Sequence, residues 1–264
     1  MILAAITLFL LYAAGAWLML RSARKPRLEP LAWVLILIAI IGHSDAIMHT
    51  MRSRGAFSID LFEAISLLGW TLAVLACLIS IDKQNRVLGA ILVLSAAAGA
   101  ALTGAGGGYA EATIGGWELT AHILLSMAAA ALLFAAAVTA LLLVFLDRRL
   151  RNRRLADLPS ALPPLDALEK VMFRLIAAGF GLLTLALLTG FVFVTNLFTQ
   201  NLVQKTVLSL VAWLVFGVLL IGRWRFGWRG RSAVRWTLFG FGILALAYFG
   251  VKFVLEYLFG RHWG

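Results

Sequence analysis

The lysines and arginines of this chain gather between long apolar runs, and they do so in every second gap. Eighteen of its 23 basic residues fall within the segments 21–27, 83–86, 148–174 and 223–235. Loops on the cytoplasmic side of a membrane protein carry an excess of Lys and Arg. The pattern therefore predicts a polytopic membrane protein whose basic segments all lie on the cytoplasmic side.

The apolar runs between these segments are long enough to cross a bilayer, because a hydrocarbon core of ~30 Å takes about 20 residues of α-helix. Such runs cover residues 2–20, 31–49, 61–80, 87–103, 119–146, 171–198, 206–222 and 236–258. The sequence thus predicts an all-α bundle of about eight transmembrane helices, forming a single transmembrane domain over residues 1–264. Because the number of spans is even and the first leads into a basic segment, both termini are expected outside. In a bacterial inner membrane that side is the periplasm.

The composition excludes a soluble protein. The chain is 62% hydrophobic and 13% charged, which leaves no stretch for a separate soluble domain. A net charge of +11 would indicate nucleic-acid binding in a soluble protein, but here the basic residues stand at helix ends, where they face anionic lipid headgroups. Membrane lipid is therefore the expected partner, and nucleic acid is not. The lone Cys77 excludes an internal disulfide and CxxC redox chemistry.

The histidines all fall on the predicted outer side. His43 lies about 12 residues into the helix predicted over 31–49, so it is ~18 Å from the cytoplasmic end of that helix. His49 follows on the same helix but is turned by about 240° from His43, so the two cannot easily share a ligand. His122 opens the helix predicted over 119–146 at its outer end, and His262 follows the outer end of the last predicted helix.

Two imidazoles from different helices can serve as axial ligands of a haem iron. The matching depths of His122 and His262 therefore make them candidate haem ligands. The competing interpretation is that each is an interfacial residue that forms ordinary hydrogen bonds. The sequence has no HExxH motif, no Cys/His zinc spacing and no Ser/His/Asp order, so it favours neither a metalloprotease nor a hydrolase.

Two further pairs of ionisable residues have structural interpretations. Lys252 and Glu256 are one helical turn apart inside a predicted span, where ionisable groups are functional candidates by default; a structural ion pair is the preferred interpretation. Asp166, followed three residues later by Glu169, resembles a capping box and is taken to mark the start of a helix.

Several separated motifs occur in an order that resembles a known family. In the second half these are Trp117–Ser126, Met172–Arg174, Gly190-Phe191, Lys205–Ser209 and Gly227–Gly230. They are similar to the cytochrome c assembly transmembrane family, which includes the CcsA-type haem-handling proteins and a smaller YpjD/HemX-like branch. In the first half, His43, the segments 60–62 and 64–67, and Trp70 resemble the smaller branch.

The resemblance implies haem as a cofactor and assigns three histidines. His122 matches the first periplasmic haem-ligating histidine of the family, His262 matches the second, and His43 matches one histidine of a pair within the membrane. No other metal ligand is implied. The expected function is haem handling or cytochrome c assembly at the periplasmic face, with haem and cytochrome c maturation or other membrane assembly proteins as partners.

Two departures from the family pattern limit this expectation. Residues 195–205 contain no tryptophan, where the haem exporters carry a tryptophan-rich signature, and Gly222-Arg223 stands where the second membrane histidine would be. Haem-lyase activity is therefore not expected, and the chain is not expected to be an enzyme. The alternative is a non-haem scaffold or regulatory protein that recruits a partner through its basic loops. A permease would show broken helices in an inverted repeat, and no such repeat is found.

The charge pattern generates the first testable prediction. A cysteine introduced by Arg151→Cys should be inaccessible to a membrane-impermeant thiol reagent in intact cells, because residue 151 belongs to a basic, cytoplasmic segment. Labelling from the periplasm would overturn the predicted topology.

Overall fold

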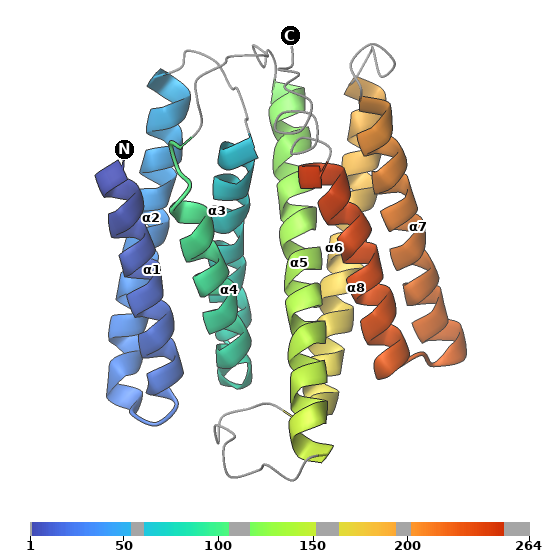
Figure 1. The fold of residues 1–264 in the computed structure, drawn as a ribbon, viewed down its shortest axis with the longest axis horizontal. Helices are drawn as coiled ribbons and strands as arrows, with labels where there is room; N and C mark the ends of the chain where they lie inside the picture. The colour runs from blue at the N-terminus through green and yellow to red at the C-terminus, as the bar shows by residue number, and fades with distance from the viewer. Residues whose placement is uncertain (1, 54–60, 106–116, 152–163, 194–201, 251–264) are drawn as a thin grey trace. The chain divides into compact units, whose positions relative to one another are not determined.

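The computed structural model describes residues 2–53, 61–105, 117–151, 164–193 and 202–250, and this part of the chain is helical (Figure 1). The α-helices are α1 (Ile2–Ser22), α2 (Glu29–Ser53), α3 (Leu61–Ser80), α4 (Arg86–Ala100), α5 (Trp117–Arg151), α6 (Leu165–Phe193), α7 (Leu202–Phe226) and α8 (Arg231–Ala245). Short turns of helix are η1 (Pro26–Leu28), η2 (Lys83–Asn85) and the π-helical η3 (Leu246–Gly250).

The helices confirm the predicted polytopic membrane bundle. Six of those described, all except α4 and α8, are long and apolar enough to cross a membrane. Helices suit this environment because each satisfies its own backbone polar groups where no water can do so. The described parts of α4 and α8 are shorter, at 15 residues each.

The ends of several helices differ from the predicted ones. α5 continues to Arg151 and α6 already begins at Leu165, because a helix does not stop where its apolar run stops: its backbone hydrogen bonds persist into the interfacial region. Asp166 lies in the first turn of α6, so the prediction that it marks the start of this helix is confirmed. The carboxylate oxygens of Glu169 accept from Arg223 and Gly230 instead of closing a capping box. Lys252 and Glu256 lie outside the described residues.

The chain forms two compact units. Unit 1 comprises Met1–Thr113 and Arg148–Pro164, and unit 2 comprises Ile114–Asp147 and Leu165–Gly264. A single domain over residues 1–264 stays a prediction, and each unit is described by itself below.

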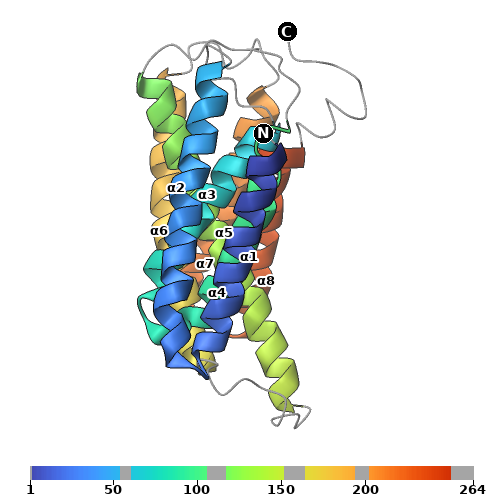
Figure 2. The same cartoon turned by 90° about the vertical axis from the view of Figure 1, so that its left-hand side faces the viewer.

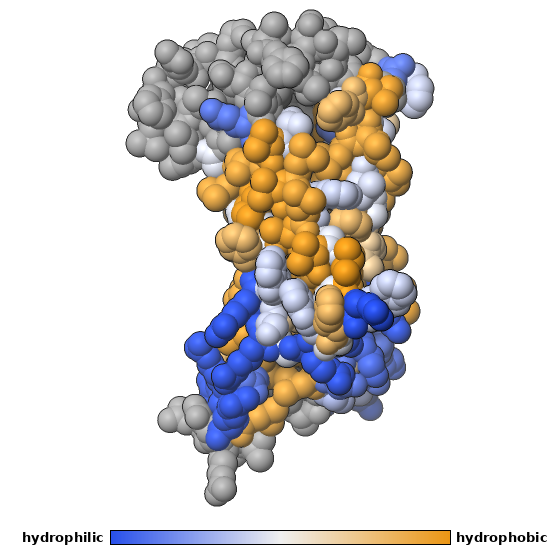
Figure 3. All heavy atoms as spheres, turned by 90° about the vertical axis from the view of Figure 1, so that its right-hand side faces the viewer, coloured by the Kyte–Doolittle hydropathy of each residue, from blue (hydrophilic) through white to orange (hydrophobic). Residues whose placement is uncertain are grey.

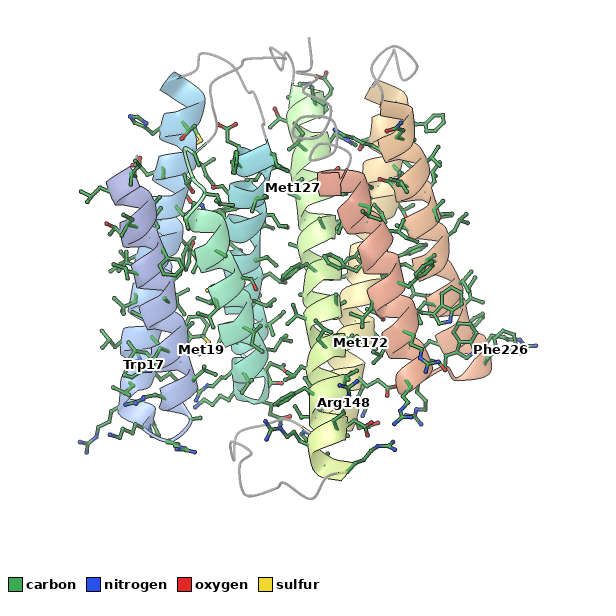
Figure 4. The ribbon with its side chains drawn as sticks, viewed as in Figure 1. Trp17, Met19, Met127, Arg148, Met172 and Phe226 are labelled. Atoms are coloured by element: carbon green, nitrogen blue, oxygen red, sulfur yellow. The ribbon has the colours of Figure 1, made fainter. Side chains whose placement is uncertain are left out.

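In unit 1, α1 packs against α2 and α4, and α3 packs against α4 (Figures 1 and 2). Tyr12, Ile36, Leu88 and Leu92 are among its fully buried side chains. Met19, labelled in Figure 4, accepts a hydrogen bond on its sulfur from Ser80 Oγ at 3.7 Å. Glu29 at the start of α2 pairs with Arg86 at the start of α4. Buried apolar contacts and a few polar bonds therefore fix this unit together.

α3 and α4 approach each other backbone to backbone. A Cβ atom added to Gly99 would lie 2.9 Å from the Cα of Gly69 and 2.9 Å from the carbonyl oxygen of Ile65. Small residues at such a crossing let membrane helices pack closely. This contact fixes the end of α4 against α3, and Thr103 follows directly after it.

In unit 2, α7 packs against α6 and α8. α5 joins them through Phe134, whose ring meets Phe241 of α8 edge-on at 5.5 Å, and through Leu133, which packs on Gly179 of α6. Met172, labelled in Figure 4, is fully buried and accepts a hydrogen bond on its sulfur from Thr237 Oγ1 at 3.9 Å. The side chains of all four helices thus contribute to one core.

Glu169 of α6 ties three elements together at the arginine-rich end of unit 2. Its Oε1 accepts a hydrogen bond from Arg223 Nη1 of α7 at 2.9 Å, and its Oε2 accepts one from the backbone N–H of Gly230 at 3.2 Å. Gly230 has φ 62°, a left-handed conformation that favours glycine. The carboxylate therefore fixes the turn that leads into α8.

The outer face of α7 is apolar. Between Val207 and Ile221 its exposed residues are Val207, Leu210, Val211, Leu214, Val218 and Ile221. Figure 3, which shows the face at the right of Figure 1, has a band of hydrophobic side chains with hydrophilic ones gathered below it. This is the surface expected of a helix that faces lipid.

The α3–α4 contact generates a prediction. Gly99→Ala should lower the free energy of unfolding by about 1–3 kcal/mol, because the added methyl group meets backbone atoms that cannot move aside. Thermal unfolding in detergent would measure the loss. Gly181→Ala is the matched control, since a Cβ there has nothing within 4 Å and helix propensity favours alanine. Equal stability of the two variants would contradict the close approach.

Candidate functional site

Three polar side chains meet around His43 in the interior of unit 1. His43 Nε2 lies 2.9 Å from Ser66 Oγ of α3 and 3.2 Å from Thr103 Oγ1, and the two hydroxyl oxygens are 2.7 Å apart. On the other side of the ring, the hydroxyl of Tyr12 in α1 lies 3.4 Å from Nδ1. We call Tyr12, His43, Ser66 and Thr103 the His43 cluster.

The position of the proton on His43 follows from Tyr12. The Tyr12 side chain is 0% exposed, and among the described residues its hydroxyl has no hydrogen-bond partner except His43 Nδ1. A buried O–H without an acceptor is costly, so the phenol must donate to Nδ1. In a neutral imidazole only the other nitrogen then carries a proton. His43 is therefore the Nε2–H tautomer and donates toward Ser66 and Thr103.

Trp70 fixes the helix turn that carries His43. Its indole N–H donates to Ser44 Oγ at 2.7 Å and lies 3.3 Å from the carbonyl oxygen of Ile40. Ser44 is the neighbour of His43 in α2, and Trp70 belongs to α3. The bond therefore holds α2 and α3 together next to the cluster.

An open pocket adjoins the His43 cluster. Its cavity volume is about 20 Å³, enough for a water molecule. Its described lining residues are Ile47, Thr50, Glu63, Ser66, Leu67, Thr103 and Gly104. Two members of the cluster, Ser66 and Thr103, thus form part of its wall, while His43 lies behind them.

His122 of unit 2 has a different environment. It lies in the second turn of α5 and is half-buried. Its Nδ1 is 3.0 Å from Thr189 Oγ1 of α6. Gly190, the residue after Thr189, packs directly against the imidazole: a Cβ added there would lie 3.0 Å from His122 Cε1. The imidazole is therefore held between α5 and the end of α6.

Thr189 determines the tautomer of His122. The Thr189 hydroxyl lies 2.9 Å from the carbonyl oxygen of Leu185 and 3.0 Å from that of Ala186, so its single proton is donated to its own helix. Its oxygen can then only accept from Nδ1–H of His122. In this tautomer Nε2 keeps its lone pair, and the ring also lies within hydrogen-bonding reach of the Ala186 backbone. A ring nitrogen in this state is a metal ligand.

One turn further along α5, Tyr248 of η3 donates a hydrogen bond from its hydroxyl to the carbonyl oxygen of Ser126 at 3.4 Å. This bond ties the end of the described α8 segment to α5. The part of the chain that follows, with His262, lies outside the described residues.

The candidate residues predicted from the sequence are therefore not gathered into one described site. His43 belongs to unit 1 and His122 to unit 2, and the proposed pairing of His122 with His262 stays a prediction. His49 is exposed whereas His43 is buried, as their angular offset implies. Within the described ranges, no three His, Cys, Asp or Glu side chains come together as a metal site would need.

Sequence reasoning missed the hydroxyl partners of both histidines. Ser66 was part of the family resemblance but had no assigned role, and Thr103 and Thr189 carried no motif. Thr103 is 60 residues from His43, and Thr189 is 67 residues from His122. Only the packing of the helices shows these pairs.

Comparison with known proteins gives one family. Residues 58–259 match the family described as Cytochrome C assembly protein. No solved structure matches the chain.

Curated relatives match over part of their length. The chain is 43% identical over 148 residues to the inner membrane protein YpjD of Escherichia coli (strain K12), covering 56% of this chain and 55% of that protein. It is 38% identical over 142 residues to an uncharacterized 28.8 kDa protein of Azospirillum brasilense, covering 53% and 52%. It is 32% identical over 107 residues to the cytochrome c biogenesis protein CcsA of Synechococcus elongatus, covering 40% and 33%. The chain thus spans about half the length, or less, of these curated relatives.

The two hydrogen-bond patterns generate a prediction about protonation. In protein labelled with ¹⁵N-histidine, His43 should show the Nε2–H tautomer and His122 the Nδ1–H tautomer, because their partners differ. Imidazole ¹⁵N chemical shifts measure this directly, with His43→Gln and His122→Gln variants assigning the signals. The same tautomer at both residues would contradict one of the two arrangements.

Proposed function

This chain belongs to the cytochrome c assembly protein family, and from this membership and the geometry of His122 we propose that it binds haem in a bacterial inner membrane. The resemblance drawn from the sequence, including the YpjD-like branch, is confirmed by the matches. The proposed task is haem handling for cytochrome c assembly, with haem itself and other assembly proteins as partners.

The observation that carries the proposal is the state of His122. Its Nδ1 is held by Thr189, and its Nε2 has a lone pair directed away from that bond. Histidines that ligate metals donate the other ring N–H to an oxygen in this way, which fixes the ring and raises its basicity. The residues present therefore fit an axial haem ligand.

The second ligand is proposed to be His262, on the family resemblance alone. His43 is the reserve candidate. Both of its ring nitrogens already form hydrogen bonds inside unit 1. His43 could therefore bind iron only if its hydrogen bond with Tyr12, or the one with the Ser66–Thr103 pair, were broken. His122, whose Nε2 is not needed for such a bond, is therefore the preferred haem ligand.

The bound haem would supply the iron–porphyrin group that cytochrome c assembly needs. The chain's own residues would hold it. His122 would be a ligand, Thr189 would position the His122 imidazole, and Gly190, which has no side chain, would leave room beside that imidazole. We propose that the chain does not form the covalent link between haem and cytochrome, because residues 195–205 lack the tryptophan-rich signature.

The proposed haem site lies on the periplasmic side. His122 is about 8 Å from the start of α5, whereas the arginines are at the other end of that helix. By the positive-inside rule the arginine-rich end is cytoplasmic. Both termini are accordingly proposed to be periplasmic.

A second candidate function is recruitment of a partner by the basic segments without haem. The end of α7 favours it: Trp224 is 87% exposed and Phe226, labelled in Figure 4, is 71% exposed, with Arg225 between them also exposed. An absorption spectrum separates the two functions. A haem-free protein that stays haem-free after haem supplementation, and copurifies with a partner, would favour recruitment.

The haem proposal generates a prediction for His122. Purified wild-type protein should show a Soret band, and His122→Ala should lose most of its haem or shift the band, because the iron loses an axial ligand. His262→Ala should have a similar effect. His49→Ala is the control and should leave the spectrum unchanged. A wild-type Soret band unaltered in the His122→Ala, His262→Ala double variant would move the assignment to His43.

Thr189 can be tested as a positioning residue. Thr189→Val keeps the shape but removes the acceptor for Nδ1–H, so haem affinity should fall by roughly 10- to 100-fold. In the haem-free protein, the same variant should lose the uniform Nδ1–H tautomer of His122 in the ¹⁵N spectrum. Thr189→Ser should restore both properties. A fall in affinity with an unchanged tautomer would show that Thr189 acts through packing alone.

A further inference from the structure

Asp45 is a carboxylate on the exposed face of α2. Among the described residues its side chain forms no hydrogen bond or ion pair. Apolar residues exposed on the same face of α2 (Figure 2) recur every three or four positions; they are Leu31, Val34, Ile38, Ile41 and Met48. We call these five residues and Asp45 the α2 stripe. Ionisable groups in spanning helices generally face the bundle interior and pair there, so a carboxylate in an exposed apolar stripe requires a partner from elsewhere.

The neighbouring helix α1 shows the depth of Asp45. A Cβ added to Gly42 would lie 3.2 Å from Leu8 Cδ2, so these two residues are level in the antiparallel α1–α2 pair. Asp45 lies about 4.5 Å beyond Gly42, whereas α1 continues roughly 8–9 Å beyond Leu8. It does so with Ile2 and Leu3, which are both 80% exposed. Apolar surface therefore extends outward past the carboxylate, which lies within the hydrocarbon layer, where an unpaired charge is costly.

His49 supplies the chemistry that Asp45 lacks. It lies one turn further along α2 and about 40° around the helix, so both residues are on one face. Its side chain is also exposed, and among the described residues it too forms no hydrogen bond or ion pair. Side chains of a helix lean toward its N-terminus, so the imidazole reaches back toward the level of Asp45. One face of α2 thus carries both a hydrogen-bond acceptor and a donor.

A second copy of the chain would present the same two groups in the same direction. Copies insert in one orientation, because the alternation of basic segments determines the topology. Two α2 helices that meet along the stripe are then parallel and related by a twofold axis, so a contact made by one copy is repeated by the other. Residues spaced by three and four positions are those that interdigitate between parallel helices, and a polar residue among them fixes the register.

We propose that the α2 stripe is the contact surface of a homodimer, in which the imidazole N–H of His49 donates to the carboxylate of Asp45 of the partner subunit. The twofold axis forms this bond twice, so both carboxylates gain a partner, and the apolar residues of the stripe pack around them. The partner is a second copy of this chain because the stripe is complementary to itself. The contact is separate from the proposed haem site, since α2 belongs to unit 1 and His122 to unit 2.

Disulfide crosslinking in lipid vesicles tests the contact. In a Cys77→Ala background, Ile41→Cys places a thiol on the stripe, and Leu214→Cys places one on the exposed face of α7 as the matched control. Oxidation with copper phenanthroline should join most of the Ile41→Cys protein into dimers, and the yield should persist when the protein is diluted in lipid. The Leu214→Cys protein should be joined only by collision, so its yield should fall on dilution.

Variants test the polar pair, with energy transfer between labelled protomers in vesicles as the measure of affinity. Asp45→Ala and His49→Ala should each weaken the dimer by roughly 3- to 30-fold, the range for a polar pair between membrane helices. The double variant should lose little more than either, because each single change already breaks the pair. Thr7→Ala is the matched control and should change nothing, since this exposed hydroxyl donates to Leu3 of its own helix.

Two outcomes would overturn the proposal. One is that Ile41→Cys protein is crosslinked no better than Leu214→Cys protein, which means that the stripe does not meet a second copy. The other is that the Asp45→Ala, His49→Ala double variant dimerises as strongly as wild type. If Asp45→Ala fails to insert, Asp45→Asn and His49→Ala decide the question. His122→Ala protein without haem should dimerise as wild type does, so failure of the haem proposal would leave this one standing.

Discussion

A polar group inside a membrane protein must find its partner within the protein, because the surrounding hydrocarbon offers none. This constraint makes the described chain helical and also determines its two candidate sites. His43 and His122 are both in spanning helices, and each is matched by hydroxyl groups of other helices. The partners differ, however, and so does the chemistry. Tyr12 makes His43 a donor toward its pocket, whereas Thr189 leaves His122 with a ligating lone pair.

The same constraint applies at the arginine-rich end of unit 2. Glu169 uses both carboxylate oxygens, one for Arg223 and one for the backbone of Gly230. The Arg223 guanidinium also lies over the ring of Phe173 at 4.6 Å and donates to the carbonyl oxygen of Trp228 at 3.2 Å. A charge in this interfacial layer is thus stabilised by several groups at once, and the α7–α8 turn takes its shape from them.

The sequence predicted the helices well, but it did not predict the hydrogen-bond partners of His43 and His122. Hydropathy and charge alternation located all eight α-helices of the described ranges, since both properties are local. The ends of α5 and α6 were missed because helical hydrogen bonding continues past the apolar run. The histidines could be identified as candidate ligands from the sequence, and the family resemblance singled out His43 and His122. The roles of Tyr12, Thr103 and Thr189 depend on which helix faces pack against each other, and a single sequence does not contain that information.

The length of α5 has a mechanical consequence. Its 35 residues extend about 52 Å at the rise of an α-helix, which exceeds both a hydrocarbon core of ~30 Å and the ~40–45 Å that include the headgroups. Such mismatch is relieved by tilt or by projection beyond the lipid. Arg148, labelled in Figure 4, and the residues after it form the last turn of α5, at the end opposite His122. Unless the helix tilts enough to absorb the excess length, the end opposite His122 projects into the aqueous layer, where a soluble molecule can touch it without entering the bilayer.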